Sequence, residues 1–367
     1  MKTEKVIIFG AGKIGKKMCK KILDEGGKIL EIWDNGKRED ILYGYVIKKP
    51  HLYEELEEKP DRIIISMANQ YKNECIEQCL ELNIPLNIIE MYTYYDKEII
   101  LQKYKDTEDS EVAKYLYYLK DNDLSMINEP YTKEYDNVKI DIYRDEEAGL
   151  FYTWYKNKKI YFKRSFSKRR CEIYMKSILI EQDCRSPHCY LDEKFFINKK
   201  SIVLDCGAAE GVFGLDNIDE MEHLIMAECD LEWIEALNYT FKDYKDKITV
   251  IEKKIGGVDT IDCITIDDIL KDYAIDFIKM DIEGAESFAI AGMNKFLEQD
   301  KNNKCVICTY HKTEDAVNFE EIFKKNGYEC YFQKGMVYIC QIAEEGMITC
   351  NFDFRKAVLR ASKTMNI

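Results

Sequence analysis

The sequence has no long hydrophobic run, no excess of basic residues, no internal repeat of fixed period and no low-complexity tract. Without repeats or biased composition, solenoid and disordered scaffolds are excluded. The apolar run near the start, VIIF, spans four residues, so we expect neither a signal peptide nor a transmembrane helix. The net charge of −14 disfavours binding to nucleic acid or to an anionic membrane surface. We therefore expect a cytoplasmic globular protein.

Cysteine is present 14 times, but the cysteines are scattered along a chain of 367 residues. This spacing favours reduced thiols in a cytoplasmic protein over a disulfide scaffold. Cys305 and Cys308 form a CxxC pair in the apolar run CVICTY. A strand there would send the two side chains to opposite faces, so we expect neither a zinc site nor a redox site.

Two stretches of the chain share one pattern, in which an apolar run, a glycine turn and an amphipathic stretch precede a second apolar run ending in an acid. They cover roughly residues 5–95 and 201–341. Strands that alternate with helices predict a parallel α/β sheet in each, and the length fits two domains. We expect an N-terminal Rossmann-like domain at residues 1–95, a connecting segment at 96–160, a second α/β domain at 161–345 and a C-terminal tail at 346–367.

The second stretch ends in two short apolar runs, YECYF at residues 328–332 and MVYIC at 336–340, joined by a glycine turn. We expect these runs to form an antiparallel hairpin that closes a seven-stranded sheet. A parallel sheet with such an end is the layout of class I methyltransferases and differs from a plain dinucleotide-binding domain.

The first glycine turn, GAGKIG, places Gly10, Gly12 and Gly15 between a strand and a helix, and Asp34 ends the next strand. Glycines in this pattern let a backbone approach a pyrophosphate, and the acid binds ribose hydroxyls. We identify no clear hydride-transfer partner for a nicotinamide cofactor in the sequence. A nucleotide or nucleotide-sugar ligand, a nicotinamide cofactor and a structural or assembly role all stay open. The domain resembles the N-terminal Rossmann-like modules of surface-polysaccharide biosynthesis enzymes, which favours a nucleotide sugar.

The second glycine turn, VLDCGAAEGVF, places Asp205, Gly207 and Gly211 after a strand, and Glu228 ends the next strand. This pattern suits S-adenosylmethionine, because the glycines admit the methionine part and the acid accepts the ribose hydroxyls. A carboxylate near the turn also suits the ammonium and sulfonium charges of this compound. Another kind of nucleotide is the alternative ligand.

Five segments of the second stretch, in order, resemble FkbM-type S-adenosylmethionine-dependent methyltransferases. They are EQDCRSPHCYL, CGAAEGVF, TIDDI, IKMDIEGAE and CTYHKTED. The resemblance covers roughly residues 161–340 and implies a class I methyltransferase fold and methyl transfer, typically to a hydroxyl of a sugar or polyketide-like acceptor. It assigns Asp205, Gly207 and Gly211 to the cofactor loop and Glu228 to the ribose.

Asp281 and His311 end two neighbouring strands of the second stretch, and His188 lies just before the cofactor strand. We expect these three residues to orient or deprotonate the acceptor, since strand ends bind substrates and histidine titrates near neutral pH. Glu283 and Glu286 are candidates for capping free amides. Asp281, Glu283 and His311 are also a candidate ligand set for a metal ion, but no diagnostic spacing is present and we predict none.

We therefore predict O-methylation of a sugar or glycan precursor in polysaccharide biosynthesis, with S-adenosylmethionine as methyl donor and a small molecule or glycan as acceptor. Two alternatives remain. One is a nicotinamide-dependent enzyme that uses the first glycine turn, and the other is a non-catalytic module that binds nucleotide sugars.

Overall fold

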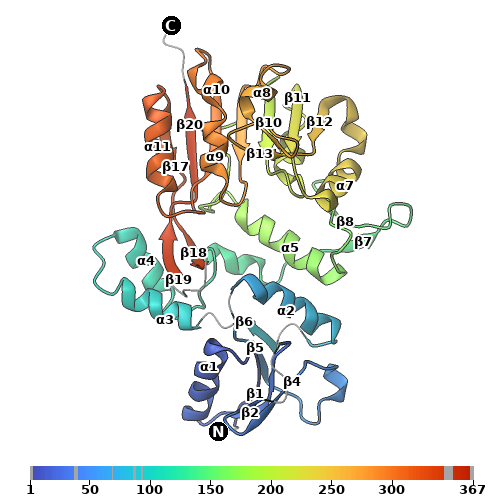
Figure 1. The fold of residues 1–367 in the computed structure, drawn as a ribbon, viewed down its shortest axis with the longest axis vertical. Coiled ribbons are helices and arrows are strands. Elements are labelled where there is room, and N and C mark those ends of the chain that lie inside the picture. The colour runs from blue at the N-terminus through green and yellow to red at the C-terminus, as the bar shows by residue number, and fades with distance from the viewer. Residues whose placement is uncertain are drawn as a thin grey trace. The chain divides into compact units, whose positions relative to one another are not determined.

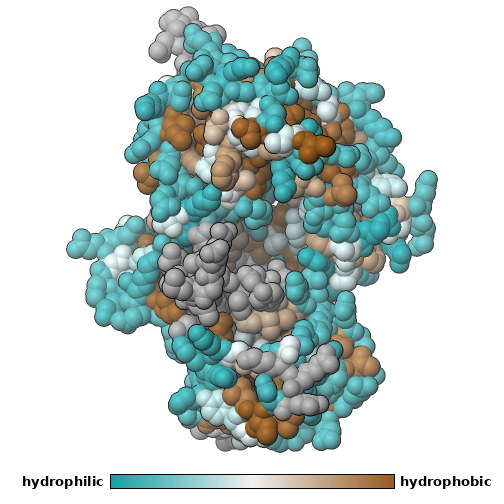
Figure 2. Space-filling view, in the orientation of Figure 1, coloured by the Kyte–Doolittle hydropathy of each residue, from teal (hydrophilic) through white to brown (hydrophobic). Residues whose placement is uncertain are grey.

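The computed structural model describes residues 3–36, 40–67, 69–85, 88–91, 94–342 and 350–363. It divides the chain into two compact units, unit 1 at Met1–Lys103 and unit 2 at Tyr104–Ile367. Within the described residues, no helix is both long and apolar enough to span a bilayer. Figure 2 shows polar side chains over much of the visible face of unit 2, with apolar ones scattered among them.

Unit 1 is a six-stranded sheet in the order β3-β4-β2-β1-β5-β6, in which all pairs are parallel except β3 with β4. Its strands are β1 (Lys5–Phe9), β2 (Lys28–Trp33), β3 (Ile41–Leu42), β4 (Tyr45–Lys48), β5 (Arg62–Ile65) and β6 (Ile89–Met91). Its helices are α1 (Lys13–Asp24), α2 (Asn69–Glu81) and α3 (Tyr94–Lys103), with a short 3₁₀ helix at Tyr53–Glu55. Met18 and Ile22 of α1 join the core on one face, and Cys75 and Cys79 of α2 join the core on the other.

Unit 2 is built on a seven-stranded sheet in the order β12-β11-β10-β15-β16-β20-β17. The first five are parallel, and β20 runs antiparallel to both of its neighbours. The strands are β10 (Ile202–Cys206), β11 (His223–Ala227), β12 (Ile248–Ile251), β15 (Phe277–Met280), β16 (Lys304–Cys308), β17 (Glu329–Phe332) and β20 (Val358–Ser362). This is the sheet of a class I, Rossmann-like methyltransferase, and the predicted fold class is confirmed.

Helices cover both faces of this sheet (Figure 1), because alternate strand residues are apolar on each side. One core contains α5 (Lys168–Glu181), α6 (Val212–Asn217) and α7 (Leu231–Thr240). The other contains α8 (Ile266–Ile269), α9 (Glu286–Ala291), α10 (Asn294–Glu298) and α11 (Asp315–Lys325). Cys308 joins the first core and Cys305 the second, so the CxxC pair is split between the two faces, as predicted.

The end of the sheet differs from the expected hairpin. β17 pairs with β20, whereas the run at residues 336–340 lies in β18 (Val337–Ile342) and pairs with β19 (Cys350–Arg355). The predicted tail therefore supplies a strand inside the sheet, and its assignment as a tail was wrong. The buried Arg360 interrupts the apolar residues of β20, and lysines lie on both sides of the strand, so the sequence there does not look like an apolar run.

The expected connecting segment also differs, because its residues from Tyr104 onward belong to unit 2. They form α4 (Ser110–Tyr118), a 3₁₀ helix (Pro130–Tyr135) and a small sheet of β7 (Ile142–Arg144), β8 (Phe151–Tyr155) and β9 (Lys158–Tyr161). Ile142 and Leu150 are buried in the same core as Val203 of β10. The segment shows little periodicity because short elements with few apolar residues each bury one side against the larger domain. Two further strand pieces, β13 (Lys254–Ile255) and β14 (Cys263–Ile264), pair beside the main sheet, and a 3₁₀ helix (Lys242–Lys247) precedes β12.

Candidate active site

A cavity of about 380 Å³ lies in unit 2 beyond the carboxyl ends of β10 and β15. Its walls are the loop after β10, the last turns of α5, and residues that follow β15 and β16. Met126 and Ile339 also line it, so segments outside the main sheet complete the walls. Open parallel sheets bind ligands at this edge, where strand ends leave backbone groups and side chains free to contact them.

The glycines of the cofactor loop are required by packing inside the protein. Gly207 has a φ of +75°, and a Cβ there would lie 2.1 Å from the carbonyl oxygen of Asp281. Gly211 has a φ of +83°, and a Cβ there would lie 2.6 Å from Cε2 of Phe241. At both positions, the positive φ and the short distance to a Cβ favour glycine on steric grounds. The structure places Gly207 in the cavity wall, while Gly211 packs under the loop against α7.

Asp205 is fully buried in β10 and forms an ion pair with Lys279 of β15, whose Nζ lies 3.0 Å from its Oδ1. The same Nζ donates a hydrogen bond of 2.7 Å to the carbonyl oxygen of Gly207. Burial opposes the charge of Lys279, but the carboxylates of Asp205 and Asp281 outweigh it and raise the lysine pKa. Asp205 therefore fixes the cofactor loop through Lys279, which the sequence analysis did not identify.

Glu228, directly after β11, is bound to the same loop. Its Oε2 accepts a hydrogen bond of 3.0 Å from the amide of Ala209, and its Oε1 accepts bonds of 2.7 and 2.9 Å from the amides of Cys229 and Asp230. A carboxylate has about four lone-pair sites, so one remains for a ligand hydroxyl. Glu228 lies beside the cofactor loop, as expected, although it does not line the cavity itself.

Asp281 lines the cavity and is surrounded by donors. It accepts hydrogen bonds from the hydroxyls of Tyr190, at 2.7 Å, and Tyr310, at 3.4 Å. Burial favours its neutral form, but His188 at the low pH where its imidazole is protonated, together with Lys279, His311 and the Tyr190 bond, prevails and lowers the pKa of Asp281 to about 2. Asp281 is thus an anion at neutral pH, positioned by two tyrosines.

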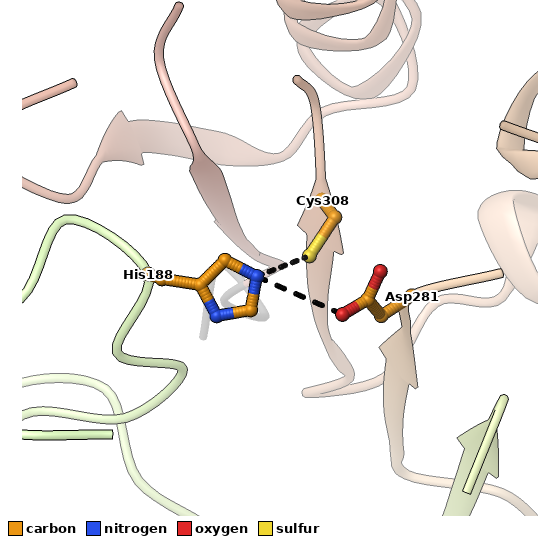
Figure 3. Close-up of side chains that lie close together, drawn as sticks. All are labelled: His188, Asp281 and Cys308. Carbon is orange, nitrogen blue, oxygen red and sulfur yellow. Dashed lines mark hydrogen bonds and ion pairs between the residues drawn. The ribbon is translucent and has the colours of Figure 1, made fainter. Parts of the chain in front are cut away.

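His188 faces Asp281 and Cys308, and one nitrogen of its ring points toward both side chains (Figure 3). Its Nε2 is 3.7 Å from Oδ2 of Asp281, 3.8 Å from Sγ of Cys308 and 3.2 Å from the hydroxyl of Tyr310. Burial lowers the pKa of His188, so its imidazole is neutral near pH 7. Because Tyr190 and Tyr310 line the cavity and His188 does not, this histidine positions Tyr310 without facing a ligand.

His311 follows β16 and is held by carboxylates. Its Nδ1 lies 3.0 Å from Oε1 of Glu286, and its Nε2 lies 3.6 Å from Oε2 of Glu283. Burial opposes the charge of His311, but Glu283, Glu286 and Asp281 raise its pKa to about 10. An imidazolium cannot accept a further proton, so the geometry favours a fixed cation over the predicted base. Glu286 also accepts a hydrogen bond of 2.9 Å from the amide of Ile282, which confirms its capping interpretation.

Several cavity residues were not identified from the sequence. Glu181 ends α5, and Glu210 lies in the cofactor loop, where its Oε2 accepts a hydrogen bond of 2.8 Å from the hydroxyl of Tyr174. Glu181 lies in the segment EQDCRSPHCYL, and Glu210 lies in CGAAEGVF. The signal that could have found them is therefore the resemblance of these segments, rather than a local pattern.

Two groups of side chains lie close enough to share a metal ion. They are His188 with Asp281 and Cys308, and Asp281 with Glu286 and His311. In the first group, burial raises the pKa of the Cys308 thiol well above its usual value, which disfavours the thiolate that binds metals. In the second, a protonated His311 has no free ring lone pair to offer to a metal ion. The prediction that no metal is used stays a prediction.

The glycine turn of unit 1 is also tightly packed. Gly10 has a φ of +115°, and a Cβ on Gly15 would lie 1.6 Å from the carbonyl oxygen of Gly10. Oδ2 of Asp34 accepts a hydrogen bond of 2.8 Å from the amide of Ala11. A Cβ on Gly12 meets no atom of the described residues within 4 Å. Packing thus explains Gly10 and Gly15, and a nucleotide or nicotinamide ligand in unit 1 stays a prediction.

The comparisons with known proteins concern mainly the second unit. Residues 185–330 match the family model of the methyltransferase FkbM domain. The crystal structure of the methyltransferase FkbM from Methylobacillus flagellatus KT is similar at 16% identity and a TM-score of 0.41, over 98% of this chain and 90% of that one. No curated protein matches the chain.

Two further solved structures align with about half of the chain. The precorrin-6y C5,15-methyltransferase from Geobacter metallireducens GS-15 is 12% identical, with a TM-score of 0.31, over 46% of this chain and 83% of that one. The SAM-dependent O-methyltransferase from Thermotoga maritima is 11% identical, with a TM-score of 0.30, over 47% of this chain and 62% of that one. The motif resemblance, the strand order of unit 2 and the family model agree: residues 185–330 form a methyltransferase domain of the FkbM family.

Proposed function

We propose that the cavity of unit 2 binds S-adenosylmethionine and that the protein transfers its methyl group to a hydroxyl of a sugar or glycan precursor. When bound, this cofactor supplies a methyl group on a positively charged sulfur. The observation that carries the proposal is the acidic character of the cavity beside the cofactor loop. Glu181, Glu210, Asp281 and Glu283 line it, and carboxylates stabilise ammonium and sulfonium charges.

The residues of the loop have distinct roles in this proposal. Asp205 and Lys279 hold the carbonyl of Gly207 in place, and the loop binds the methionine part. Glu228 keeps one lone-pair site for a ribose hydroxyl while its other sites hold the amides of Ala209 and the residues that follow β11. A preformed loop of this kind lowers the entropic cost of binding.

The acceptor side of the cavity combines aromatic rings with oxygen acceptors. Tyr174, Tyr190 and Tyr310 line it, and Asp281 fixes the hydroxyls of the last two. Rings that cover apolar sugar faces, next to groups that bind hydroxyls, suit a polyhydroxylated acceptor. His188 positions Tyr310, and Asp281 and His311 keep their charges fixed near the reacting atoms. Such an acceptor is consistent with a role in polysaccharide biosynthesis in the cytoplasm.

Calorimetric titration of S-adenosylmethionine into the wild type and Glu228→Ala tests the cofactor assignment. We expect measurable binding to the wild type and at least about tenfold weaker binding to the variant, because a hydrogen-bonded ribose contact is lost. Glu222→Ala is a matched control, since Glu222 is exposed at the opposite end of β11. Undetectable binding to the wild type, or unchanged affinity in Glu228→Ala, would overturn the assignment.

A second measurement tests the acceptor. Methyl-labelled S-adenosylmethionine is incubated with the protein and a panel of free sugars and nucleotide sugars, and the products are separated by mass. Label in a sugar that survives mild base supports an ether product. Label found only in protein or in nitrogen-containing acceptors would contradict hydroxyl methylation.

A further inference from the structure

The charged side chains that line the cavity are mostly acidic. Four carboxylates line it, at Glu181, Glu210, Asp281 and Glu283. Among the described residues that line it, Lys279 is the one basic side chain, and its ammonium is held by Asp205 and by the carbonyl oxygen of Gly207. The carboxylates therefore repel one another with little compensation inside the cavity.

Three of these carboxylates have partners. Glu210 is bonded to Tyr174, Asp281 to Tyr190, and Glu283 lies 3.6 Å from His311. Glu181 differs, because within the described part of the chain no hydrogen bond or ion pair reaches its carboxyl group, and the charges that act on it are all negative. A partly buried carboxylate without a partner is costly, so this group holds a proton or meets a positive charge or a donor from a ligand.

The surroundings of Glu181 show how strongly the proton is held. Burial and the charges of Asp281, Glu210 and Glu283 raise its pKa to about 8. The other titratable groups that line the cavity are Tyr174 on α5, Tyr190, Lys279 on β15 and Tyr310 after β16. Lys279 is held by Asp205, and the tyrosines stay neutral because burial and nearby carboxylates raise their pKa values.

We infer that Glu181 is the proton acceptor of this site, ionised when the bound cofactor carries its sulfonium charge and protonated when the cofactor sulfur is neutral. The inference rests on the proposed function. In the transfer step the methyl carbon exchanges its bond to sulfur for a bond to the hydroxyl oxygen. The electron pair of the broken bond stays on sulfur, and the hydroxyl proton passes to Glu181, which later releases it to water.

The charge of the cofactor provides a test that needs no acceptor. S-adenosylmethionine and S-adenosylhomocysteine share the ammonium, the carboxylate and the nucleoside, and they differ by the methyl group and the sulfonium charge. Calorimetry at pH 7.0 in phosphate and in imidazole buffer, whose ionisation heats differ, counts the protons exchanged on binding. A group with a pKa of about 8 is about nine-tenths protonated at this pH.

We expect S-adenosylmethionine to release close to one proton on binding and S-adenosylhomocysteine to release close to none. The affinity of the wild type for S-adenosylmethionine should weaken about ninefold from pH 7 to pH 6, because a proton at about pKa 8 competes with the sulfonium charge. Glu181→Gln should release no proton with either compound. Glu172→Gln is the control, since Glu172 lies on the same helix and pairs with Arg169 outside the cavity.

The outcomes separate the inference from the function on which it rests. If neither wild type nor Glu172→Gln binds S-adenosylmethionine, the proposed function fails. If the wild type binds it with equal proton release for both compounds, or if Glu181→Gln still releases a proton, the inference fails. The comparison of the two compounds in the wild type decides the question even where Glu181→Gln does not fold.

Discussion

Charged side chains inside unit 2 are neutralised by partners that are distant in the sequence. Lys279 pairs with Asp205 across two neighbouring strands, and His311, after β16, pairs with Glu286 at the start of α9. Each pair fixes a backbone segment of the site, because Lys279 also bonds Gly207 and Glu286 also bonds Ile282. At the scale of the residue, buried ion pairs therefore hold the site in place, and their contribution to the free energy of unfolding depends on pH.

His311 gives a prediction about stability against pH. Its pKa is raised in the folded protein, from 6.5 to about 10, so its stabilising contribution is present below about pH 6.5 and is lost as the pH rises towards 10. His311→Gln should destabilise unit 2 at pH 7 by on the order of 3 kcal/mol, and its difference from the wild type should shrink towards pH 10.

Urea unfolding at several pH values, followed by tryptophan fluorescence, measures this difference. A Trp33→Phe background leaves Trp154 and Trp233, both in unit 2, as the fluorescent probes. His223→Gln is the control, because burial lowers the pKa of His223 and its effect should stay constant from pH 7 to 10. A constant difference between His311→Gln and the wild type over this range would contradict the prediction.

At the scale of the element, the strand-to-helix turns are set by close backbone approaches. In the GAGKIG turn, a Cβ on Gly15 would lie 1.6 Å from the carbonyl oxygen of Gly10, whereas a Cβ on Gly12 meets open space. We expect Gly15→Ala to destabilise unit 1 by at least about 3 kcal/mol and Gly12→Ala by about 1 kcal/mol or less. The two variants form a matched pair within one turn.

Hydrogen exchange of the backbone amides of β1 and β5, measured by mass spectrometry, reports on unit 1 alone. Protection should fall in Gly15→Ala and persist in Gly12→Ala. Equal protection in the two variants would show that the turn tolerates a side chain at both positions. Nucleotides that raise the thermal stability of the wild type but not of Gly12→Ala would in turn support a ligand at this turn.

The sequence predicts most strands of both units, because each is an apolar β-branched run with a turn or an acid at its end. It does not predict β20, whose centre is Arg360. This side chain is fully buried and donates hydrogen bonds of 2.9 and 2.8 Å to the carbonyl oxygens of Tyr190 and Cys189, and it pairs with Asp192 at 2.6 Å. A buried arginine depends on partners 168 to 171 residues away, which no local pattern contains.

Only part of the candidate site could be predicted from the sequence. The cofactor loop and Asp281 follow from motifs, because strand ends and glycine turns leave local signals in the sequence. The state of each titratable group depends on tertiary contacts instead. Nearby carboxylates raise the pKa values of both His311 and Glu181, and the residues next to these two in the sequence do not indicate it.

At the scale of the whole molecule, the boundaries of the folded units decide which fragments can be made. Unit 2 begins at Tyr104 and includes β20, whereas the sequence alone predicts a domain at residues 161–345. A fragment of residues 161–345 lacks β20, which pairs with both β16 and β17, and it lacks the buried Ile142 and Leu150. We expect it to aggregate or to remain unfolded, since β17 loses its partner, β16 loses one of its two partners and one core is opened.

A fragment of residues 104–367 should instead fold and bind S-adenosylmethionine within about twofold of the affinity of the full chain, because every described residue of the cavity lies within it. Circular dichroism with thermal unfolding and calorimetry measure both properties. A fragment that ends at residue 356, before β20, separates the two causes, since it keeps residues 104–160 and loses the strand. Cooperative unfolding of the 161–345 fragment would contradict this division, because that fragment would then fold without β20 and residues 104–160. Loss of binding in the folded 104–367 fragment would also contradict it, because the cavity would then depend on residues that unit 2 does not contain.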